Sequence, residues 1–339
     1  MVMNRKNNSR WSVLLTLILV VCCIILNSCG KKTQKSKVYH VGILSGLDFF
    51  TKITDGFKSR MTKLGYVEGK NIVYDFQKTN FDMAAYESIL KKFVADKVDL
   101  IFTFPTESAL VAKAVTKGTN IPVLFACSFM EDTNLINSVQ EPGENITGVR
   151  FPGPDIALKR FEIMHEFIPG AKRMWVPYQK GYPSITSQFA MLNPAAAAAG
   201  VTLIEVPASD AKELEAEFQK HANSVNSETD VVLVIAEPFC VTPDSYMVIS
   251  KFADEHKIPV GGALMSIGGY ETIFGLNPQI IPQGRQAAFL ADKILKGTPA
   301  GTIPVVSAEG YFQINYKSAK KFGLKVPEGL LSRADKIIR

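Results

Sequence analysis

The sequence predicts an α/β protein made of two Rossmann-like lobes, each built around a parallel sheet. Apolar strand-like segments alternate with amphipathic helix-like segments, which is typical of parallel sheets covered by helices on both faces. The same alternation starts again after Pro142 and Gly143. About 310 residues follow residue 28, which is enough for two lobes of ordinary size.

The first half contains four strand-like segments separated by helical patterns. Apolar residues recur at helical spacing from Phe50 to Leu64, and Gly65 is expected to end that helix. We expect strands at 38–44, 71–76, 99–104 and 121–126, and helices at 50–64, 82–96 and 108–117.

The second half repeats this architecture without a residue-level repeat. We expect strands at 146–149, 173–178, 202–206, 230–236 and 258–263. Helices are expected at 155–167, around 195–199, and at 211–222 and 243–256.

The N-terminus has the pattern of a bacterial export signal. A basic start precedes an apolar run at 13–26, and the small Ser28 stands directly before Cys29. The run is shorter than the about 20 residues that span a bilayer. We expect residues 1–28 to be a signal peptide, cleavage before Cys29, and lipid on the Cys29 thiol. The alternative is an ordinary signal peptide whose cysteine is incidental.

Residues 29–37 are expected to be a flexible, lipidated linker, because 31–37 (KKTQKSK) contain no apolar residue. Two or three acyl chains would hold the protein on a membrane. The sequence therefore predicts an exported protein, lipid-anchored to the cell membrane and facing the periplasm or the cell exterior.

The positive charge is confined to these N-terminal segments. The formal net charge is +6, but it falls to +3 without the three basic residues of the signal and to −1 without the four linker lysines. A nucleic-acid-binding domain would carry a positive patch of its own. We therefore expect no nucleic-acid partner.

Two of the five cysteines are left for the folded part. Cys22 and Cys23 leave with the signal peptide, and Cys29 would be acylated. Cys127 and Cys240 are too far apart in sequence for a metal-knuckle spacing. Buried thiols are favoured over a disulfide between them.

Ligands of open parallel sheets bind beyond the carboxyl ends of the strands. The loops expected there share aromatic, hydroxyl and carboxylate side chains. The candidate ligand-binding residues among them are Ser45, Asp48, Phe49, Thr106, Glu107, Ser128, Tyr178 and Glu237.

Several of these candidates have a structural alternative. Thr106 and Ser108 precede a predicted helix, whose free N–H groups suit an anion such as a carboxylate, but the two hydroxyls could instead cap the helix. Glu107 could hold an ammonium group, although acidic residues are common in first helical turns without any ligand. Helical spacing assigns Phe50 to the core and leaves Phe49 available for stacking on a ring.

No catalytic constellation is evident. The four histidines are not paired at metal-ligand spacing, and no phosphate-binding loop or nucleophile elbow is present. We expect no enzyme activity, no metal and no cofactor.

Three motifs carry a resemblance to a known family. They are 65–71 (GYVEGKN), 142–149 (PGENITGV) and 284–288 (GRQAA), followed by 294–297 (ILKG) and 315–324 (NYKSAKKFGL). In this order the chain resembles, from Val38 onward, the ABC-transporter substrate-binding lipoproteins whose best-known members bind tryptophan or tyrosine.

The resemblance implies a type I periplasmic-binding-protein fold, with a three-crossover hinge that closes over a small-molecule ligand. It places 38–150 and 276–300 in the N-terminal lobe, and 151–275 and 301–339 in the C-terminal lobe. It also implies ABC permease subunits as partners, and we expect the protein to be a monomer.

One segment departs from the family pattern. Family members usually have Gly-hydrophobic-Asp-Tyr-Tyr before the Gly-Arg-Gln helix, and that aspartate can hold a ligand ammonium. Here 275–279 reads GLNPQ, so the neutral Asn277 takes the place of the aspartate. A charge-assisted hydrogen bond would become an ordinary one, roughly half as strong. Asn277 is a further candidate ligand-binding residue.

The sequence thus predicts the lipid-anchored solute-binding component of an ABC importer. Its ligand is expected to be a small organic molecule, with aromatic amino acids and aromatic carboxylates as the first classes. The alternatives are a surface lipoprotein that senses a ligand and signals to a membrane receptor, and a surface hydrolase. A sugar-binding repressor would carry a DNA-binding module where this chain has an export signal.

Overall fold

A computed structural model of the protein describes residues 37–80 and 82–339. Residues 39–339 form one compact unit. The predicted signal peptide and the predicted lipid attachment at Cys29 lie outside the described residues, as do Cys22 and Cys23.

The first sheet has six strands, all paired in parallel, in the order β13-β5-β4-β3-β1-β2. Its strands are β1 (Tyr39–Ser45), β2 (Ile72–Lys78), β3 (Leu100–Phe104), β4 (Val123–Ser128), β5 (Ile146–Arg150) and β13 (Val306–Ser307). β3 and β4 are buried along their whole length because helices cover both faces of this sheet.

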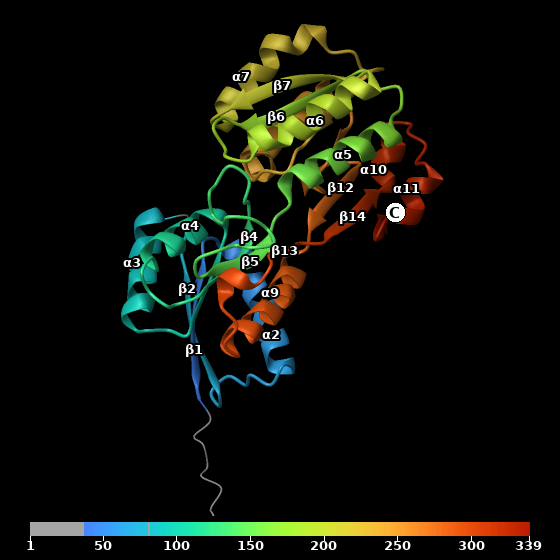
Figure 1. Ribbon diagram of the computed structural model, residues 1–339. Helices are drawn as coiled ribbons and strands as arrows, with labels where there is room; N and C mark the ends of the chain where they lie inside the picture. The colour runs from blue at the N-terminus through green and yellow to red at the C-terminus, as the bar shows by residue number, and fades with distance from the viewer. Residues whose placement is uncertain (1–36, 81) are drawn as a thin grey trace, which may run out of the picture. The chain divides into compact units, whose positions relative to one another are not determined.

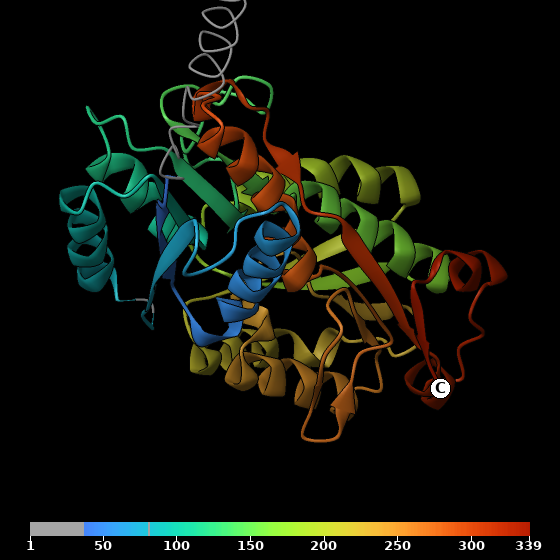
Figure 2. The same ribbon diagram turned by 90° about the horizontal axis from the view of Figure 1, so that it is seen from below.

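Helices α3 and α4 cover one face of this sheet, and α2 and α9 cover the other (Figure 1). Their bounds are α2 (Thr51–Lys63), α3 (Met83–Ala95), α4 (Thr106–Val115) and α9 (Ile280–Leu295). α2 and α9 lie side by side (Figure 2), and Gly56 and Gly284 allow this approach because each faces backbone of the other helix. The chain therefore returns to the first sheet after most of the second half has been built.

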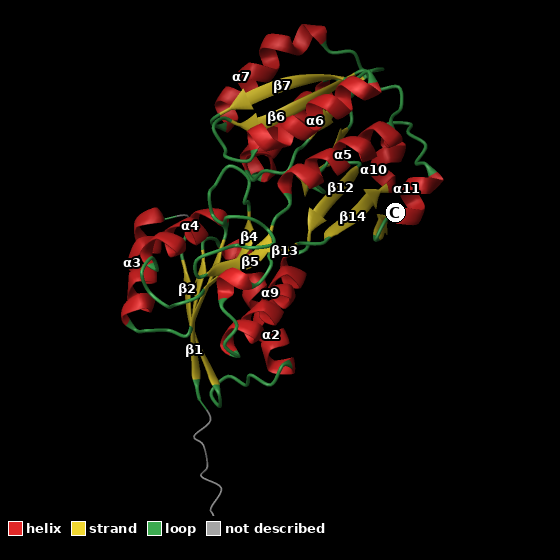
Figure 3. Ribbon diagram, in the orientation of Figure 1, coloured by secondary structure: helices red, strands yellow, loops and turns green. Residues whose placement is uncertain are grey.

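The second sheet has four parallel strands in the order β7-β6-β8-β9. They are β6 (Arg173–Gln179), β7 (Thr202–Ala208), β8 (Asp230–Leu233) and β9 (Val260–Gly261). Helices α5 (Gly153–Phe167) and α6 (Ile185–Ala199) pack on one face, and α7 (Ala211–His221) and α8 (Pro243–Glu255) on the other. Figure 3 shows this alternation of helices and strands.

A smaller three-stranded sheet completes the second half. Its order is β12-β14-β15, with β12 and β14 antiparallel. The remaining elements are β10 (Ser266–Ile267), β11 (Tyr270–Glu271), β12 (Phe274–Pro278), β14 (Gly310–Asn315), β15 (Lys336–Ile338), α10 (Tyr316–Lys321), α11 (Glu328–Arg333) and the 3-10 turns η1 (Asp48–Phe50), η2 (Ala222–Ser224), η3 (Phe239–Val241) and η4 (Ala300–Thr302).

The predicted α/β class with two parallel sheets is confirmed, while several bounds differ. The strand expected at 230–236 ends at Leu233. The Val234 N–H still donates to Gly261 of β9, but side chains take over the bonding beyond it: Arg160 donates to the Val234 carbonyl and Gln188 pairs with Ala236. The strand expected at 258–263 is only Val260–Gly261.

The lobe boundaries stay a prediction. The pairing of β13 with β5 places Val306 and Ser307 in the first sheet, a few residues beyond the boundary expected at 300. β12 pairs with β14 in the smaller sheet, so the chain leaves the second half after Pro278.

Two features are absent from the described residues. Across 37–80 and 82–339, no helix combines the length and the apolar character needed to span a bilayer. The same residues contain no group of three or more His, Cys, Asp or Glu side chains that could hold a metal ion.

Candidate functional site

The carboxyl ends of β1, β3 and β4 carry the first part of the candidate site. The Gly46 N–H donates to the Phe104 carbonyl at 2.8 Å, which ties the ends of β1 and β3 together. Ser45 and Ser128 are fully buried, and their hydroxyls donate to the carbonyls of Leu47 and Ala126. Both serines lie at the predicted edge of the sheet, and both hydroxyls already donate to backbone carbonyls.

Helix α4 begins at Thr106, two residues earlier than expected, and Thr106 connects two loops. Its Oγ1 accepts the Phe129 N–H at 3.0 Å, so the start of α4 is tied to the loop after β4. The Ser108 hydroxyl lies inside the helix and donates to the Pro105 carbonyl at 2.9 Å. No side chain caps this helix, so the alternative that Thr106 and Ser108 are caps is wrong.

The loop after β4 has an unusual backbone. Cys127, Asp132 and Asn134 have φ angles of 50°, 60° and 53°, in the left-handed region that favours glycine. Asp and Asn adopt this region more readily than other residues, whereas at Cys127 it coincides with a register shift between Ala126 and Ser128. Such strain concentrates at functional sites.

Phe129, in this loop, connects the first sheet to the loop between β6 and α6. Its ring lies edge-on to Tyr182, with ring centroids 5.6 Å apart, and 5.0 Å from the ring of Phe151. A Cβ on Gly153 would collide with the Phe129 ring, so the glycine leaves room for it. Residues from both halves of the chain thus meet around Phe129.

In the second sheet, Gln188 of α6 binds the backbone just beyond the end of β8. Its Nε2 donates to the Ala236 carbonyl and its Oε1 accepts the Ala236 N–H, both at 2.9 Å. Nε2 also donates to the Ser184 hydroxyl at 3.0 Å, and Gln188 is fully buried. Gln188 was not predicted from the sequence, where its only signal is a polar residue on the apolar side of a helix.

Glu237 directly follows Ala236, the residue whose backbone Gln188 binds, and is 6% exposed. Its carboxylate accepts the N–H groups of Phe239 at 2.7 Å and Cys240 at 2.8 Å. Burial raises the pKa of Glu237, while the two N–H groups and the charge of Arg160 work against that rise. The site therefore keeps an acidic group almost out of water.

The charges of Glu107 and Glu237 both affect the pKa of the Tyr182 hydroxyl. Burial raises the pKa of the Tyr182 hydroxyl, and the charges of Glu107 and Glu237 raise it further. Burial also raises the pKa of Glu107, which is half-buried in the first turn of α4. Of the predicted candidates, Glu107 and Glu237 thus carry charges that act on the Tyr182 hydroxyl, and Thr106 is connected to Tyr182 through Phe129. Tyr182 itself was not among the predicted ligand-binding residues.

Asn277 lies on β12 against a buried arginine. Nη2 of Arg160 donates to Oδ1 of Asn277, and the same guanidinium donates to the carbonyls of Leu276 at 3.0 Å and Val234 at 3.1 Å. Arg160 is 2% exposed, and burial lowers its pKa to about 9. The oxygen of Asn277 is therefore occupied by a protein cation.

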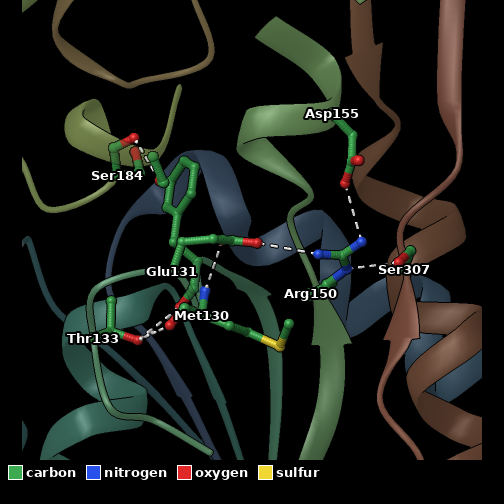
Figure 4. Close-up of polar contacts among 9 residues, drawn as sticks. Met130, Glu131, Thr133, Arg150, Asp155, Ser184 and Ser307 are labelled. Atoms are coloured by element: carbon green, nitrogen blue, oxygen red, sulfur yellow. Dashed lines mark hydrogen bonds and ion pairs between the residues drawn. The ribbon is translucent and has the colours of Figure 1, made fainter. Parts of the chain in front are cut away.

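Arg150, at the end of β5, makes a second polar cluster (Figure 4). It donates to Glu131 at 3.1 Å, to Asp155 at 3.0 Å and to the Ser307 hydroxyl at 2.7 Å. Glu131 also accepts the Met130 N–H. This cluster lies where β5 leads into α5 and beside β13, two places where the chain passes between its halves.

The remaining predicted candidates make their contacts with residues other than Tyr182. Asp48 pairs with Lys78 at 2.7 Å, and both side chains are exposed. The Tyr178 hydroxyl donates to Glu205 of β7 at 2.8 Å. Phe49 is 66% exposed, whereas Phe50 packs against the core of the first sheet, as helical spacing predicted.

Two further observations concern the surroundings of the site. Cys127 and Cys240 are buried free thiols, which confirms the prediction against a disulfide between them. A hollow of about 770 Å³ lies at the opposite end of the first sheet, near Asp99, Lys117 and Asn145. It contains none of the candidate residues.

The chain is similar to several known proteins. A curated protein of Clostridioides difficile (strain R20291), the tyrosine-binding protein, is 30% identical over 294 residues, covering 83% of this chain and 79% of its own. A conserved domain protein of Vibrio cholerae has a similar fold, with a TM-score of 0.74 and 24% identity over 89% of this chain and 100% of its own.

A pneumococcal ABC domain in complex with L-Trp has a TM-score of 0.72 and 21% identity, over 88% of this chain and 100% of its own. The model of the family described as ABC transporter substrate binding protein matches residues 41–338. The chain therefore belongs to the ABC transporter substrate-binding protein family.

Proposed function

We propose that this protein is the lipid-anchored solute-binding component of an ABC importer. It is held on the outer side of a membrane through Cys29 and captures a small organic solute that contains a flat ring. Aromatic amino acids are the first class to test, because a relative at 30% identity is a tyrosine-binding protein. The solute is then delivered to the permease subunits of the transporter.

The observation that carries this proposal is the ring pair of Phe129 and Tyr182 beside Glu107 and Glu237. The pair joins loops from the two halves of the chain at the strand ends, where open α/β sheets bind ligands. Stacking of aromatic rings contributes about 0.5–1.5 kcal/mol beyond the buried area. The adjacent carboxylates supply the polar groups that orient a ligand in such a site.

A melting-temperature screen of the purified full-length protein tests the proposal. A ligand at 100 times its dissociation constant adds about 2.7 kcal/mol of stability, which raises the melting temperature. The compounds are tyrosine, tryptophan, aromatic acids without the amine, and pentoses and hexoses. Aromatic compounds should raise the melting temperature, whereas a rise with sugars alone would contradict the proposal.

Ligand capture is expected to close the hinge between the lobes. Small-angle scattering should then give a smaller radius of gyration for the ligand-saturated protein than for the free protein. Demonstrated binding with an unchanged scattering profile would favour a rigid pocket instead.

A further inference from the structure

Arg150 connects the two halves of the chain at the first crossover between them (Figure 4). It is the last residue of β5 in the first sheet, and α5 of the second half starts at Gly153. The Arg150 guanidinium donates to Asp155, in the first turn of α5, at 3.0 Å. This ion pair therefore bridges the crossover at residues 151 and 152.

On one side of the bridge, Arg150 is fixed to the first sheet. Its Nε donates to the Ser307 hydroxyl of β13 at 2.7 Å, and its Nη1 donates to Glu131, in the loop after β4, at 3.1 Å. Glu131 also accepts the Met130 N–H at 3.2 Å, which holds the carboxylate in place. A rotation of the second half should therefore leave the guanidinium with the first sheet.

On the other side of the bridge, Asp155 belongs to a helix that is fixed to the second half. Arg160 of the same helix is buried and donates to the carbonyls of Leu276 at 3.0 Å and Val234 at 3.1 Å. Leu276 lies on β12, and Val234 directly follows β8. A rotation of the second half should therefore carry Asp155 with it.

A second crossover meets the first one at Arg150. The Phe151 N–H donates to the Ser128 carbonyl at 2.8 Å, and the Phe151 ring packs against the core of the first sheet. Ala308, in the crossover that follows β13, donates its N–H to the Arg150 carbonyl at 2.9 Å. A change in the contacts of Arg150 is thus expected to reach both crossovers.

Exposure separates the bond to Asp155 from the bonds that fix Arg150. The side chain of Asp155 is 49% exposed, whereas that of Glu131 is 20% exposed. Water and salt weaken exposed ion pairs more than buried ones. The bond to Asp155 is therefore the one in this cluster that a rotation can break at the lowest cost.

We propose that the Arg150–Asp155 ion pair is a hinge latch, which stabilises the arrangement of the two halves in this structure and breaks when the second half rotates. A bond made in one arrangement and lost in the other shifts the equilibrium toward the first. The latch thus sets how readily the cleft changes its opening without touching the solute. This inference rests on the hinge of the proposed function, but not on the identity of the solute.

Asp155→Asn tests the latch, because it keeps the size of the side chain and removes its charge. Hydrogen exchange of the full-length protein without added solute should become about twofold to fivefold faster in the peptides that contain Phe151 and Ala308, as expected when a partly exposed ion pair is lost from an opening equilibrium. Small-angle scattering of the same sample should give a changed radius of gyration. In about 1 M salt, where the Debye length is about 3 Å, the difference from the parent protein should shrink.

Asp254→Asn is the matched control. Asp254 is also 49% exposed and pairs with Lys321 at the same distance of 3.0 Å, but α8 and α10, which carry the two residues, both belong to the second half. This variant should leave the exchange of both peptides and the scattering profile like those of the parent protein.

A double-mutant cycle separates the latch from a local effect on α5. An acidic residue in a first turn also stabilises its helix through the helix dipole, and Asp155→Asn removes that effect too. In Arg150→Met the latch is already absent, so adding Asp155→Asn should change neither the exchange nor the scattering further. An effect of equal size in both backgrounds would overturn the latch.

Two other results overturn the inference. One is an Asp155→Asn protein with the exchange and scattering of the parent. The other is faster exchange at Phe151 alone, with unchanged exchange at Ala308 and unchanged scattering, because this describes fraying of α5 and not a hinge.

The solute screen distinguishes failure of the latch from failure of the proposed function. A protein with the predicted Asp155→Asn effects that binds sugars alone would overturn the aromatic solute and support the latch. Binding of aromatic compounds without any effect of Asp155→Asn would overturn the latch alone.

Discussion

Nη1 of Arg150 donates to Oε1 of Glu131 at 3.1 Å, and each side chain is only 20% exposed. The other nitrogens of the guanidinium reach Asp155 of α5 and Ser307 of β13. One side chain therefore links the loop after β4, the start of α5 and β13, at the point where the chain passes between its halves. The planar fork of arginine suits this role better than the point charge of lysine.

Replacing Arg150 should destabilise the fold. Arg150→Met leaves Glu131 without its cation, and hydrogen bonds to charged groups contribute about 1.5–3 kcal/mol each. We expect the free energy of unfolding to fall by about 2 kcal/mol, measured by urea denaturation. Lys91→Met is the control, because the exposed Lys91–Glu87 pair should contribute less than about 0.5 kcal/mol. An equal loss of unfolding free energy in the two variants would contradict the stabilising role of the Arg150 hydrogen bonds.

Asn277 should be important as an acceptor for Arg160. Asn277→Leu leaves Nη2 of a buried guanidinium unpaired, and we expect a loss of about 1–3 kcal/mol in the free energy of unfolding. Asn277→Asp keeps an acceptor and adds a countercharge, so it should be at least as stable as the parent. The urea midpoints at an unchanged m-value measure both effects. A loss in Asn277→Asp as large as in Asn277→Leu would contradict this account.

Glu107 should lower stability at neutral pH, because burial disfavours its charged form. Its folded pKa is raised by burial, so its contribution to stability is complete below the unfolded pKa and is lost as the pH rises through the folded pKa. Glu107→Gln should therefore melt above the parent at pH 7. The difference should disappear below about pH 4, where the parent carboxyl is protonated in both states. Thermal unfolding of both proteins across this pH range measures the difference in melting temperature. A variant that melts below the parent at pH 7 would contradict the destabilising effect of the Glu107 charge.

Much of the site could be predicted because strand ends follow from local patterns. Buried apolar strands and helix starts are encoded in short stretches, and the parallel pairing then brings their carboxyl ends to one edge. In this way Thr106, Glu107 and Glu237 could be named before their positions were known. The exposure of Phe49 and the packing of Phe50 also followed from helical spacing.

Contacts between distant segments could not be predicted in the same way. Arg160 and Asn277 are 117 residues apart, and no local pattern shows that an asparagine will receive a buried guanidinium. The contact of Phe129 with Tyr182 depends on the packing of two loops from different sheets. The role of Gln188 could be predicted only by knowing where the backbone of Ala236 leaves the sheet.

The membrane anchor is tested at Cys29. Cys29→Ala removes the thiol that would carry lipid, so we expect a protein that no longer fractionates with membranes. Mass spectrometry of the N-terminus measures the acyl mass directly. Acyl mass that persists on the variant would show that the predicted attachment site is wrong.

The most direct test of the central claim is the mass of the small molecule that copurifies with the protein. Native mass spectrometry of the full-length protein, followed by release and identification of the ligand, needs no choice of candidate compounds. We predict a compound with an aromatic ring, held at the ring pair of Phe129 and Tyr182. A sugar would contradict this prediction.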